Sequence, residues 1–405
     1  MVTAFVDMMG GLIVFPLIPF YATKFLGHGP LWKALDSVGM GGKGIIVALL
    51  VMVFALSQLI SAPFWGRVSD KVGRRPALMI GLGASALSFL IFAYANSLEL
   101  LFLCRIVQGA GGGTVGVVQA YVADATKPQD RVKALGWLSA ATNAGVTIGP
   151  AIGSWTLTFG PAGPGVAAAL IAVVNMIFVW FYLTESHDVA AVKASGQKIT
   201  RSRVAVWRVV SHSGEPASRL IWIYANTMGA FQVMSVVLVL FLAAKFGVTD
   251  KTIGWFFAYV GAISFLTRAF VLGKMVDWLR EAKLSRLGMV MLATGLATMP
   301  LMPTIPLLAI SVALVPLGTA FTFPCVTGLL SQIVPQHERG LYMGVQQTFG
   351  GVARVVGPLY AGWAFDHLGM GVPFYTAGVV VLLTIFLGMD MDKYVPRAAP
   401  TAPNA

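Results

Sequence analysis

The chain alternates long apolar stretches with short polar ones along its whole length. Each apolar stretch is close to the roughly 20 residues that an α-helix needs to cross a bilayer. Helices are expected because a backbone in lipid must satisfy its own hydrogen bonds, and the ten-residue alternation of a membrane barrel is absent from the sequence. The pattern therefore predicts an all-α membrane protein. The twelve stretches cover about residues 2–26, 43–65, 77–96, 98–123, 133–158, 165–184, 218–244, 252–275, 284–302, 305–332, 340–366 and 371–390.

Composition supports this prediction. Hydrophobic residues make up 57% of the 405 residues and charged residues only 11%, with a mean hydropathy of +0.80, whereas soluble domains carry about 25% charged residues. Cys104 and Cys325 lie in separate apolar stretches, so we expect packing residues and no disulfide or metal site. The first stretch has no basic segment before it and no cleavage site, so it is not a signal peptide. We expect a short cytoplasmic leader before it.

The basic residues predict the orientation. Of 28 Lys and Arg residues, 20 lie in alternate loops, after the second, fourth, sixth, eighth and tenth stretches, and in the tail; five lie in the opposite loops. By the positive-inside rule the first set is cytoplasmic, as are both termini. The net charge of +12 is then explained by membrane topology and by attraction to the anionic inner leaflet, not by binding to nucleic acid. Three arginines, Arg105, Arg268 and Arg354, lie inside apolar stretches.

A central polar stretch divides the chain. We expect a six-helix unit over residues 1–184, a cytoplasmic linker over 185–217, a second six-helix unit over 218–392 and a disordered tail over 393–405. Within the linker, Arg201–Arg208 mixes bases with apolar residues. It is either an amphipathic helix on the inner leaflet or a loose basic linker, and both interpretations stay open.

The two units repeat each other at an offset of 207 or 208 residues. Four matches in one register indicate duplication, and parallel repeats of six helices are the layout of major facilitator transporters, with the substrate site between the halves. The expected fold is therefore two pseudo-symmetric bundles of six transmembrane helices. The matches are Gly66 and Asp70 with Gly273 and Asp277, Asp130-Arg131 with Glu338-Arg339, Gly149-Pro150 with Gly357-Pro358, and Trp155 with Trp363.

The loop after the second stretch, Gly66-Arg-Val-Ser-Asp-Lys-Val-Gly-Arg-Arg75, resembles the major facilitator signature. Gly66 would let two helices approach, Asp70 can pair with Arg74 and face a helix N-terminus, and Gly73 permits a tight turn. The resemblance implies a latch of the outward-facing state that Asp124 completes; the alternative is a basic loop that only sets topology. The latch residues would be Gly66, Asp70, Gly73, Arg74, Arg75 and Asp124.

Two charged residues inside the first half are candidates for proton coupling. Asp7 precedes Pro16 and Pro19 at the spacing found in the first helix of the drug:proton antiporters, which this segment resembles. Arg105-Ile-Val-Gln108-Gly resembles that family's R-x-x-Q-G motif, whose arginine influences protonation of nearby acids. Intramembrane charges are functional candidates by default. The alternatives are an interfacial Asp7 and an Arg105 that snorkels to the outer interface.

The fifth stretch carries glycines four residues apart beside a proline. Such glycines form a ridge for close helix contact, and the proline bends the helix. The pattern resembles the antiporter motif of exporters, and this resemblance favours export over uptake; generic tight packing explains it equally well. The residues are Gly145, Gly149, Pro150 and Gly153, with Ala353, Gly357, Pro358 and Ala361 as a weaker counterpart in the eleventh stretch.

The chain departs from the tetracycline exporters, which it otherwise resembles over nearly its whole length. Those proteins carry membrane acids in helices 3 and 9 and a histidine in helix 8. Here Ser88 and Ser264 stand at the first and last of these positions, and the ninth stretch has no acid. Tetracycline is therefore not predicted as the substrate.

Several polar residues near mid-span are candidates for the substrate cavity, because polar groups facing lipid are costly. Hydrogen bonding between helices is the alternative. Arg354 could bind an anionic substrate, pair with an acid of the first half or be structural. The candidates are Gln58, Asn143, Asn226, Gln232, Tyr259, Gln346 and Arg354.

The sequence contains no G-x-x-x-x-G-K-[ST], nucleophile elbow or zinc-ligand cluster, so we expect neither ATP hydrolysis, nor an enzyme, nor a cofactor or metal. We predict a monomeric, multi-pass inner-membrane transporter that exports small amphipathic molecules against protons. Uptake symport of a metabolite and a non-transporting scaffold on the same fold are the alternatives. The retained signature and Asp7 argue against the scaffold, which needs no protonatable membrane acid.

Overall fold

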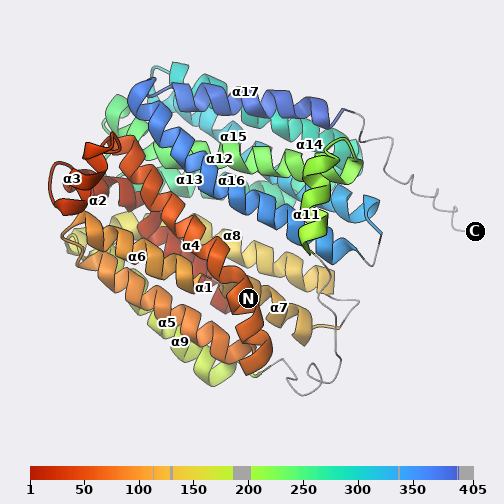
Figure 1. Cartoon of the computed structure of the whole chain (residues 1–405), viewed down its shortest axis with the longest axis horizontal. Helices are drawn as coiled ribbons and strands as arrows, with labels where there is room; N and C mark the ends of the chain where they lie inside the picture. Colours follow the sequence, from red (N-terminus) through yellow and green to blue (C-terminus); the bar gives the residue numbers. More distant parts are fainter. Residues whose placement is uncertain (113, 128–130, 186–201, 336–337, 390, 392–405) are drawn as a thin grey trace, which may run out of the picture.

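The computed structural model describes residues 1–112, 114–127, 131–185, 202–335, 338–389 and 391. These residues form helices joined by short loops (Figure 1). The first half consists of α1 (Val2–Val14), η1 (Phe15–Leu17), α2 (Ile18–Lys24), α3 (Pro30–Ser37), α4 (Lys43–Val72), α5 (Arg74–Ala93), α6 (Leu98–Gly111), α7 (Thr114–Ala125), α8 (Arg131–Thr156), η2 (Leu157–Phe159) and α9 (Gly163–Tyr182).

The second half follows α11 (Ser202–Ser211) and has the same order of long helices. It consists of α12 (Pro216–Phe246), α13 (Ile253–Leu266), the π-helical turn η3 (Thr267–Val271), α14 (Leu272–Thr298), η4 (Met299–Leu301), α15 (Ile305–Ile333), α16 (Arg339–His367) and α17 (Val372–Leu387).

Eight helical runs in the described residues are long and apolar enough to cross a bilayer. One of them, residues 253–301, is 49 residues long, about 70 Å if it were straight, and it is kinked at Arg280. It therefore contains two of the expected stretches. The count of twelve crossings remains a prediction, because α8, α16 and the shorter α17 are outside the eight.

Two expected stretches are interrupted, each for a local reason. The first bends through η1, because Pro16 and Pro19 remove backbone donors there. The fourth divides between α6 and α7 beside Gly112, where consecutive glycines weaken the helix. By contrast, α4 extends past the expected residue 65 to Val72, so Gly66 and Asp70 lie on its last turns.

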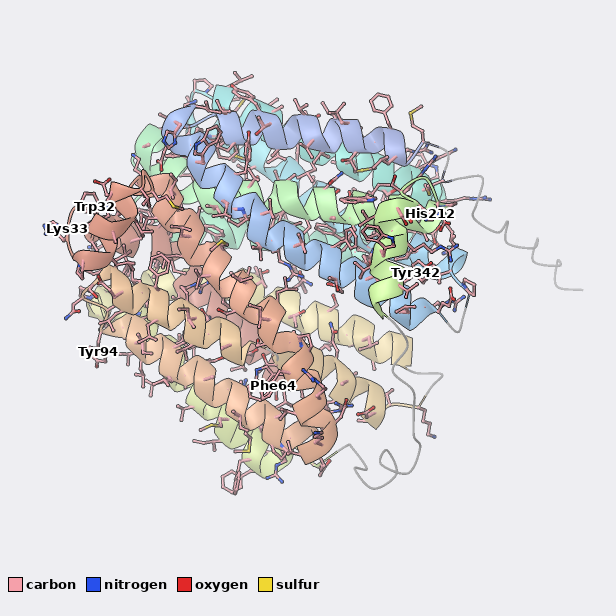
Figure 2. The ribbon with its side chains drawn as sticks, in the orientation of Figure 1. Trp32, Lys33, Phe64, Tyr94, His212 and Tyr342 are labelled. Carbon is pink, nitrogen blue, oxygen red and sulfur yellow. The ribbon has the colours of Figure 1, made fainter. Side chains whose placement is uncertain are left out.

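The two halves pack in matching ways. In the first, α1 packs on α8 and α9, and α5 packs on α6 and α9; in the second, α12 packs on α16 and α17, and α14 packs on α15 and α17. The halves meet where α4 contacts α16 and α8 contacts α13. Figure 2 shows Trp32 and Tyr94 at one end of the bundle, called the α3 end, and His212 and Tyr342 at the other, called the α11 end.

Large apolar side chains also cover the outside of the bundle, as lipid contact requires. Tryptophans are exposed on many helices, where they can anchor the protein at the membrane interfaces. Cys104 and Cys325 are buried and unpaired, as the sequence predicts. The exposed tryptophans are Trp137, Trp155, Trp180, Trp207, Trp255, Trp278 and Trp363.

Within the linker the structure forms the helix α11 over Ser202–Ser211, so this part is helical rather than a loose segment, and its position on the inner leaflet stays a prediction; Arg201 lies outside the described residues. Ala205 and Val209 are buried where α11 packs on α12 and α16. Trp207 stays exposed on another face. Arg208 donates hydrogen bonds to Glu215, and these bonds raise the pKa of the Arg208 guanidinium.

The repeat also reveals a strained turn. Gly73, at the turn between α4 and α5, has φ 102°, and the offset of 207 places Arg280 at the matching position. Arg280 has φ 61° and ψ 163°, a conformation that is nearly restricted to glycine and costs other residues about 1–3 kcal/mol.

We therefore expect Arg280→Gly to stabilise the protein by about 1 kcal/mol, after the entropic cost of a glycine. Lys283, an exposed residue within the helical part of α14, is the matched control, because Lys283→Gly should destabilise by about 1 kcal/mol. Thermal unfolding of the detergent-solubilised protein measures both. A lower Tm for Arg280→Gly would contradict the strain.

Candidate transport pathway between the halves

The signature loop forms a connected charge network. Arg74 donates from Nη1 to Asp70 Oδ1 (2.6 Å) and to Ser69 Oγ (2.6 Å), and from Nε to Asp124 Oδ2 (3.0 Å). Arg74 is buried, whereas the Asp70 side chain is 51% exposed. The structure thus brings together three of the predicted latch residues from α4, α5 and α7. One guanidinium ties the end of α4 to the end of α7.

Glu185 also joins this network, a role that no motif in the sequence indicates. Its two carboxylate oxygens accept hydrogen bonds from the backbone N–H groups of Arg74 (2.8 Å) and Arg75 (3.0 Å). It therefore caps the N-terminus of α5, where a negative charge is favourable. Arg75 itself reaches the Trp180 carbonyl. Glu185 could have been suspected only as an acid directly after an apolar stretch.

The glycines at the rim of this region are uncrowded. A Cβ added at Gly66 would meet nothing within 4 Å, and the same holds for Gly273, Gly340 and Gly344. The close helix contact expected at Gly66 is therefore not made in this conformation, because the halves are apart there. Asp277, the counterpart of Asp70, is exposed and forms no ion pair in the described part of the chain.

The glycine ridge of α8 lies against the backbone of α1. A Cβ at Gly145 would lie 2.3 Å from the Phe5 carbonyl oxygen, and Gly149 and Gly153 have the same relation to Met9 (2.6 Å) and Ile13 (2.3 Å). Three successive turns are thus in backbone contact, which larger residues would prevent.

The other side of α8 contacts the second half. A Cβ at Gly254 of α13 would lie 2.3 Å from the Pro150 carbonyl oxygen, and one at Gly261 would lie 2.7 Å from Thr147 Cα. Glycine therefore lets α8 pack closely on both sides, on α1 within its half and on α13 across the boundary. Gly254 and Gly261 were not singled out from the sequence.

The counterpart helix α16 has equivalent neighbours. Gly357 lies against Gly229 of α12, with 3.1 Å from its added Cβ to that carbonyl oxygen. Gly362, one turn beyond Pro358, lies against Gly44 of α4 at 2.5 Å. Gly357 of the predicted pattern and Gly362, which was not part of it, thus give α16 the same two kinds of contact, one within its half and one across the boundary.

Capping bonds between the halves seal the α3 end. Asp366 of α16 accepts from the backbone N–H groups of Gly44 and Ile45, both at 2.9 Å, so it caps the N-terminus of α4. Ser154 of α8 accepts from Gly254 N (2.9 Å) and donates to the Asp250 carbonyl (3.0 Å), so it caps the N-terminus of α13.

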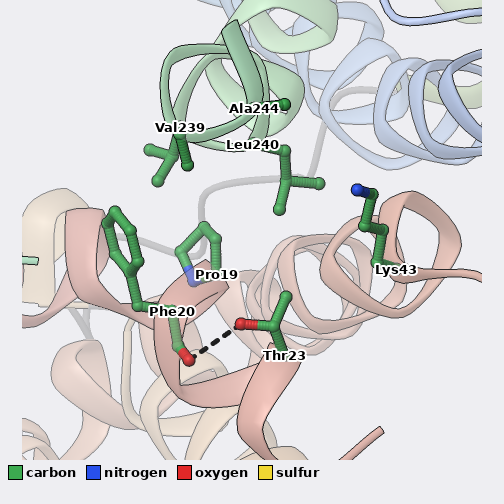
Figure 3. A pocket seen from close by; sticks show the side chains of 8 residues that line it. Pro19, Phe20, Thr23, Lys43, Val239, Leu240 and Ala244 are labelled. Carbon is green, nitrogen blue, oxygen red and sulfur yellow. Dashed lines mark hydrogen bonds between the residues drawn. The ribbon is translucent and has the colours of Figure 1, made fainter. Parts of the chain in front are cut away.

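One cavity at this end, between α2, α4 and α12, has a volume of about 230 Å³. Figure 3 shows Pro19 and Phe20 facing Val239 and Leu240 across it, with Lys43 beside them.

At the α11 end two larger cavities lie side by side. The central cavity, about 690 Å³, lies between α4 and α7 of one half and α15 and α16 of the other. The Asp7 cavity, about 970 Å³, lies between α1, α7 and α8, with Gly340 of α16 at its edge. Gly116, Gln119 and Ala120 of α7 line both, so the cavities adjoin along that helix.

Asp7 faces its cavity rather than the end of the bundle. It lies within α1 and is partly buried. Thr114 donates a hydrogen bond from Oγ1 to Asp7 Oδ2 (3.1 Å). No lysine or arginine of the described residues forms an ion pair with it. Asp7 is therefore a carboxylate inside a bundle, beside an accessible volume and with one hydroxyl partner.

Arg105 is 3% exposed, so it does not snorkel to the interface. Its Nε donates to the Leu50 carbonyl (3.4 Å), Nη1 donates to Gln108 Oε1, and the guanidinium lies 4.3 Å from the Phe54 ring centroid. The Gln108 amide in turn approaches Gly11, one turn from Asp7 on α1. Arg105 thus reaches α1 through Gln108 and is not in an ion pair with Asp7.

Four of the seven predicted cavity residues line one of the two cavities. Gln58, Gln346 and Arg354 line the central cavity, and Asn143 lines the Asp7 cavity. Asn226 lies in a lateral groove of the second half, where it donates to Thr384. Gln232 and Tyr259 line neither cavity, and the Tyr259 hydroxyl donates to the Ala309 carbonyl.

Arg268, the second arginine inside an apolar stretch, has polar partners from both halves. It lies in the π-helical turn η3 and is partly buried. It donates to Ser264 of its own helix and to Asn143 Oδ1 of the other half (3.4 Å). The π-turn directs it toward the Asp7 cavity, and π-turns often occur at functional sites.

A helical bundle with apolar outer surfaces, sealed between its halves at one end and hollow at the other, defines the class of alternating-access membrane transporters. The comparison with known families is specific: the chain matches the Major Facilitator Superfamily over residues 1–296 and 220–403. The chain belongs to that superfamily.

Similar proteins cover nearly the whole chain. It is 26% identical to the tetracycline resistance protein, class B, of Escherichia coli over 396 residues, which are 96% of this chain and 95% of that protein. It is 30% identical to multidrug resistance protein 2 of Bacillus subtilis (strain 168) over 384 residues, covering 90% and 91%. The structure of the human organic anion transporter MFSD10 matches with a TM-score of 0.74 at 21% identity, covering 96% and 97%. The fold is thus shared over its full extent.

The seal at the α3 end generates a prediction. Asp366→Ala removes two carboxylate–backbone hydrogen bonds between the halves, together about 2 kcal/mol because the side chain is only partly buried and a typical hydrogen bond contributes about 0.5–1.5 kcal/mol. We expect the population open at the α3 end to rise roughly 30-fold. Spin-label distances between Tyr94→Cys and Leu368→Cys would measure this shift, and the exposed neighbour His367→Ala is the control. Identical distance distributions in all three proteins would contradict it.

Proposed function

We propose that the chain exports small amphipathic molecules from the cytoplasm across the inner membrane in exchange for protons. The observation that carries the proposal is the pair of adjoining cavities, one of them lined by Asp7, that open between the halves at the α11 end while the α3 end is sealed. The resistance proteins among its relatives support export.

Charge supports the proposed orientation. The α11 end carries the signature loop with Arg67, Lys71, Arg74 and Arg75 and the helix α11 with Arg208. By the positive-inside rule we place this end, and both termini, in the cytoplasm. The cavities then face the cytoplasm, so a substrate enters from there and leaves after the opposite end opens.

The proposed motion is rocking of residues 1–184 against 218–392. Closure at the α11 end would bring α16 against the uncrowded Gly66 of α4. The Asp70 carboxylate, one turn further along α4, could then face the N-terminus of α16. Arg74 holds Asp70 and Asp124 in place for that contact. At the α3 end, the bonds of Asp366 and Ser154 would break. We therefore propose the Arg74 network as the latch of the closed α11 end.

Asp7 is the proposed proton carrier. An isolated carboxylate in a bundle exchanges protons most readily where water can reach it, and Asp7 lies beside the larger cavity. Arg105 would hold the position of α1 through Gln108. As a buried positive charge, it would also favour the ionised form of the Asp7 carboxylate. We propose that substrate departure follows protonation from the opposite side.

The test uses proteoliposomes with an imposed pH gradient, an internal pH dye and three fluorescent amphiphiles: cationic Hoechst 33342, neutral N-phenyl-1-naphthylamine and anionic 1-anilinonaphthalene-8-sulfonate. We expect dye movement coupled to opposite proton flux in the wild type. Asp7→Asn should lower coupled flux at least 100-fold, because the amide cannot carry the proton. Asp36→Asn, an exposed acid in α3, should behave as the wild type.

Each alternative predicts a different result. Dye and protons moving in the same direction would indicate uptake symport. Asp7→Asn with unchanged proton flux would remove Asp7 from the mechanism. A protein that moves neither protons nor any of the three dyes under any gradient would contradict the transport proposal and favour the scaffold.

A further inference from the structure

We propose that the central cavity binds an anionic group of the transported molecule, a carboxylate or sulfonate, against Arg354 of α16. The inference rests on the proposed transport function and names the substrate class of that site. The substrate would be an amphipathic organic anion, with its charge at Arg354 and its apolar body along α4 and α7.

The charges inside the bundle are unbalanced. Arg105, Arg268 and Arg354 lie within the apolar stretches, and the only acid at comparable depth among the described residues is Asp7. The ion pairs found in the described part of the chain join Arg74 to Asp70 and Asp124, and Arg208 to Glu215. None of the three interior arginines has a carboxylate partner there. Because a cation in a low-dielectric interior is costly, an anionic ligand would restore the balance.

Arg354 is the interior arginine that lines the central cavity. Its Nε donates to the Gly350 carbonyl oxygen of its own helix (3.3 Å), whereas its terminal nitrogens make no hydrogen bond within the described protein. By contrast, Arg74 also lines this cavity, but Asp70 and Asp124 compensate its charge. The uncompensated guanidinium of Arg354 presents donors suited to the two oxygens of a carboxylate or sulfonate.

A second donor lines the same cavity without a partner. Gln346, two turns before Arg354 on α16, is 0% exposed, and its Oε1 accepts from Thr327 (3.3 Å). Its Nε2 has no hydrogen-bond partner. A buried unpaired donor costs about 1–3 kcal/mol unless a ligand supplies an acceptor. Gln58, across the cavity, already uses its amide nitrogen on Gly112. Arg354 and Gln346 therefore both leave hydrogen-bond donors without a partner in this cavity.

The cavity also has room for an apolar body. Its volume of about 690 Å³ is in the range of small-molecule sites, about 300–1,000 Å³. Ala55, Leu59, Ala62 and Val117 supply apolar lining. Asp7 lies in the adjoining cavity, across α7, so a bound anion and the proposed proton carrier occupy separate places. The volume and the apolar lining of the central cavity favour an organic anion over a simple inorganic ion.

The experiment compares two fluorescent probes that share their ring system. 1-Anilinonaphthalene-8-sulfonate carries a sulfonate, and N-phenyl-1-naphthylamine carries none. Saturable binding to the full chain in nanodiscs is measured by energy transfer from tryptophan, with empty nanodiscs as the background. The variants are Arg354→Gln, Arg354→Lys and the matched control Arg219→Gln, an arginine at the start of α12 that lines neither cavity.

We expect the sulfonate probe to bind the wild type at least tenfold more tightly than the neutral one. Arg354→Gln should weaken sulfonate binding tenfold or more, because a charge-assisted contact is lost. It should change neutral-probe binding less than twofold, whereas a purely structural role would affect both probes. Arg354→Lys should retain part of the preference, and Arg219→Gln all of it.

The comparison of the two probes on the wild type does not require any variant to fold, and equal or tighter binding of the neutral probe would overturn the inference. An Arg354→Gln protein that keeps the wild-type Tm and an unchanged preference for the sulfonate probe would also overturn it. Displacement of the probe by millimolar chloride as effectively as by 1-naphthalenesulfonate would show a site for inorganic anions only and also overturn it. The binding experiment and the transport experiment can fail independently of each other. Selective sulfonate binding without proton-coupled flux contradicts the proposed function alone, and coupled flux of neutral or cationic dyes without this preference contradicts the anion site alone.

Discussion

The backbone N–H groups at the start of each helix must find acceptors, and in a membrane there is little water to supply them. Several helices of this protein begin against an oxygen from a distant part of the chain. Glu185 caps α5, Ser154 caps α13 and Asp366 caps α4. The last two caps cross from one half to the other. At the α3 end the contacts between the halves therefore include two helix caps, and no ion pair joins the halves there in the described part of the chain.

Glycine determines how near the helices can come before such caps form. In α8 the ridge Gly145, Gly149 and Gly153 brings α1 into backbone contact, while Gly254 brings α13 equally close on the other side. The glycines at the opposite rim, among them Gly66 and Gly344, have empty space around them. A transporter that closes alternately at its two ends needs packed glycines at the closed end and uncrowded glycines at the open end. Helix surfaces made of glycine can come into contact without displacing any side chain.

Much of the architecture could be predicted from the chain itself, because apolar length, charge bias and the internal repeat each follow from the bilayer. Local predictions held where one residue type imposes the geometry, as Gly73 does with its positive φ. They failed where the partner is distant in sequence. Asp366 and Gly44 are 322 residues apart, and nothing near Glu185 indicates that α5 begins beside it. Polar character alone could not separate Gln346, which lines the cavity, from Gln232, which does not.

The two halves share a framework but differ in where their charges lie. In the first half Arg74 is held between two carboxylates, whereas the matching loop of the second half keeps Asp277 without an ion pair in the described structure and has the strained Arg280 in place of glycine. Deeper in the bundle the charges of the two halves are opposite. The carboxylate Asp7 belongs to the first half, and the uncompensated Arg354 belongs to the second. Duplication explains the common helices. In the proposed mechanism, the division of Asp7 and Arg354 between the halves means that rocking changes the surroundings of both side chains, so that proton and substrate would be coupled without direct contact.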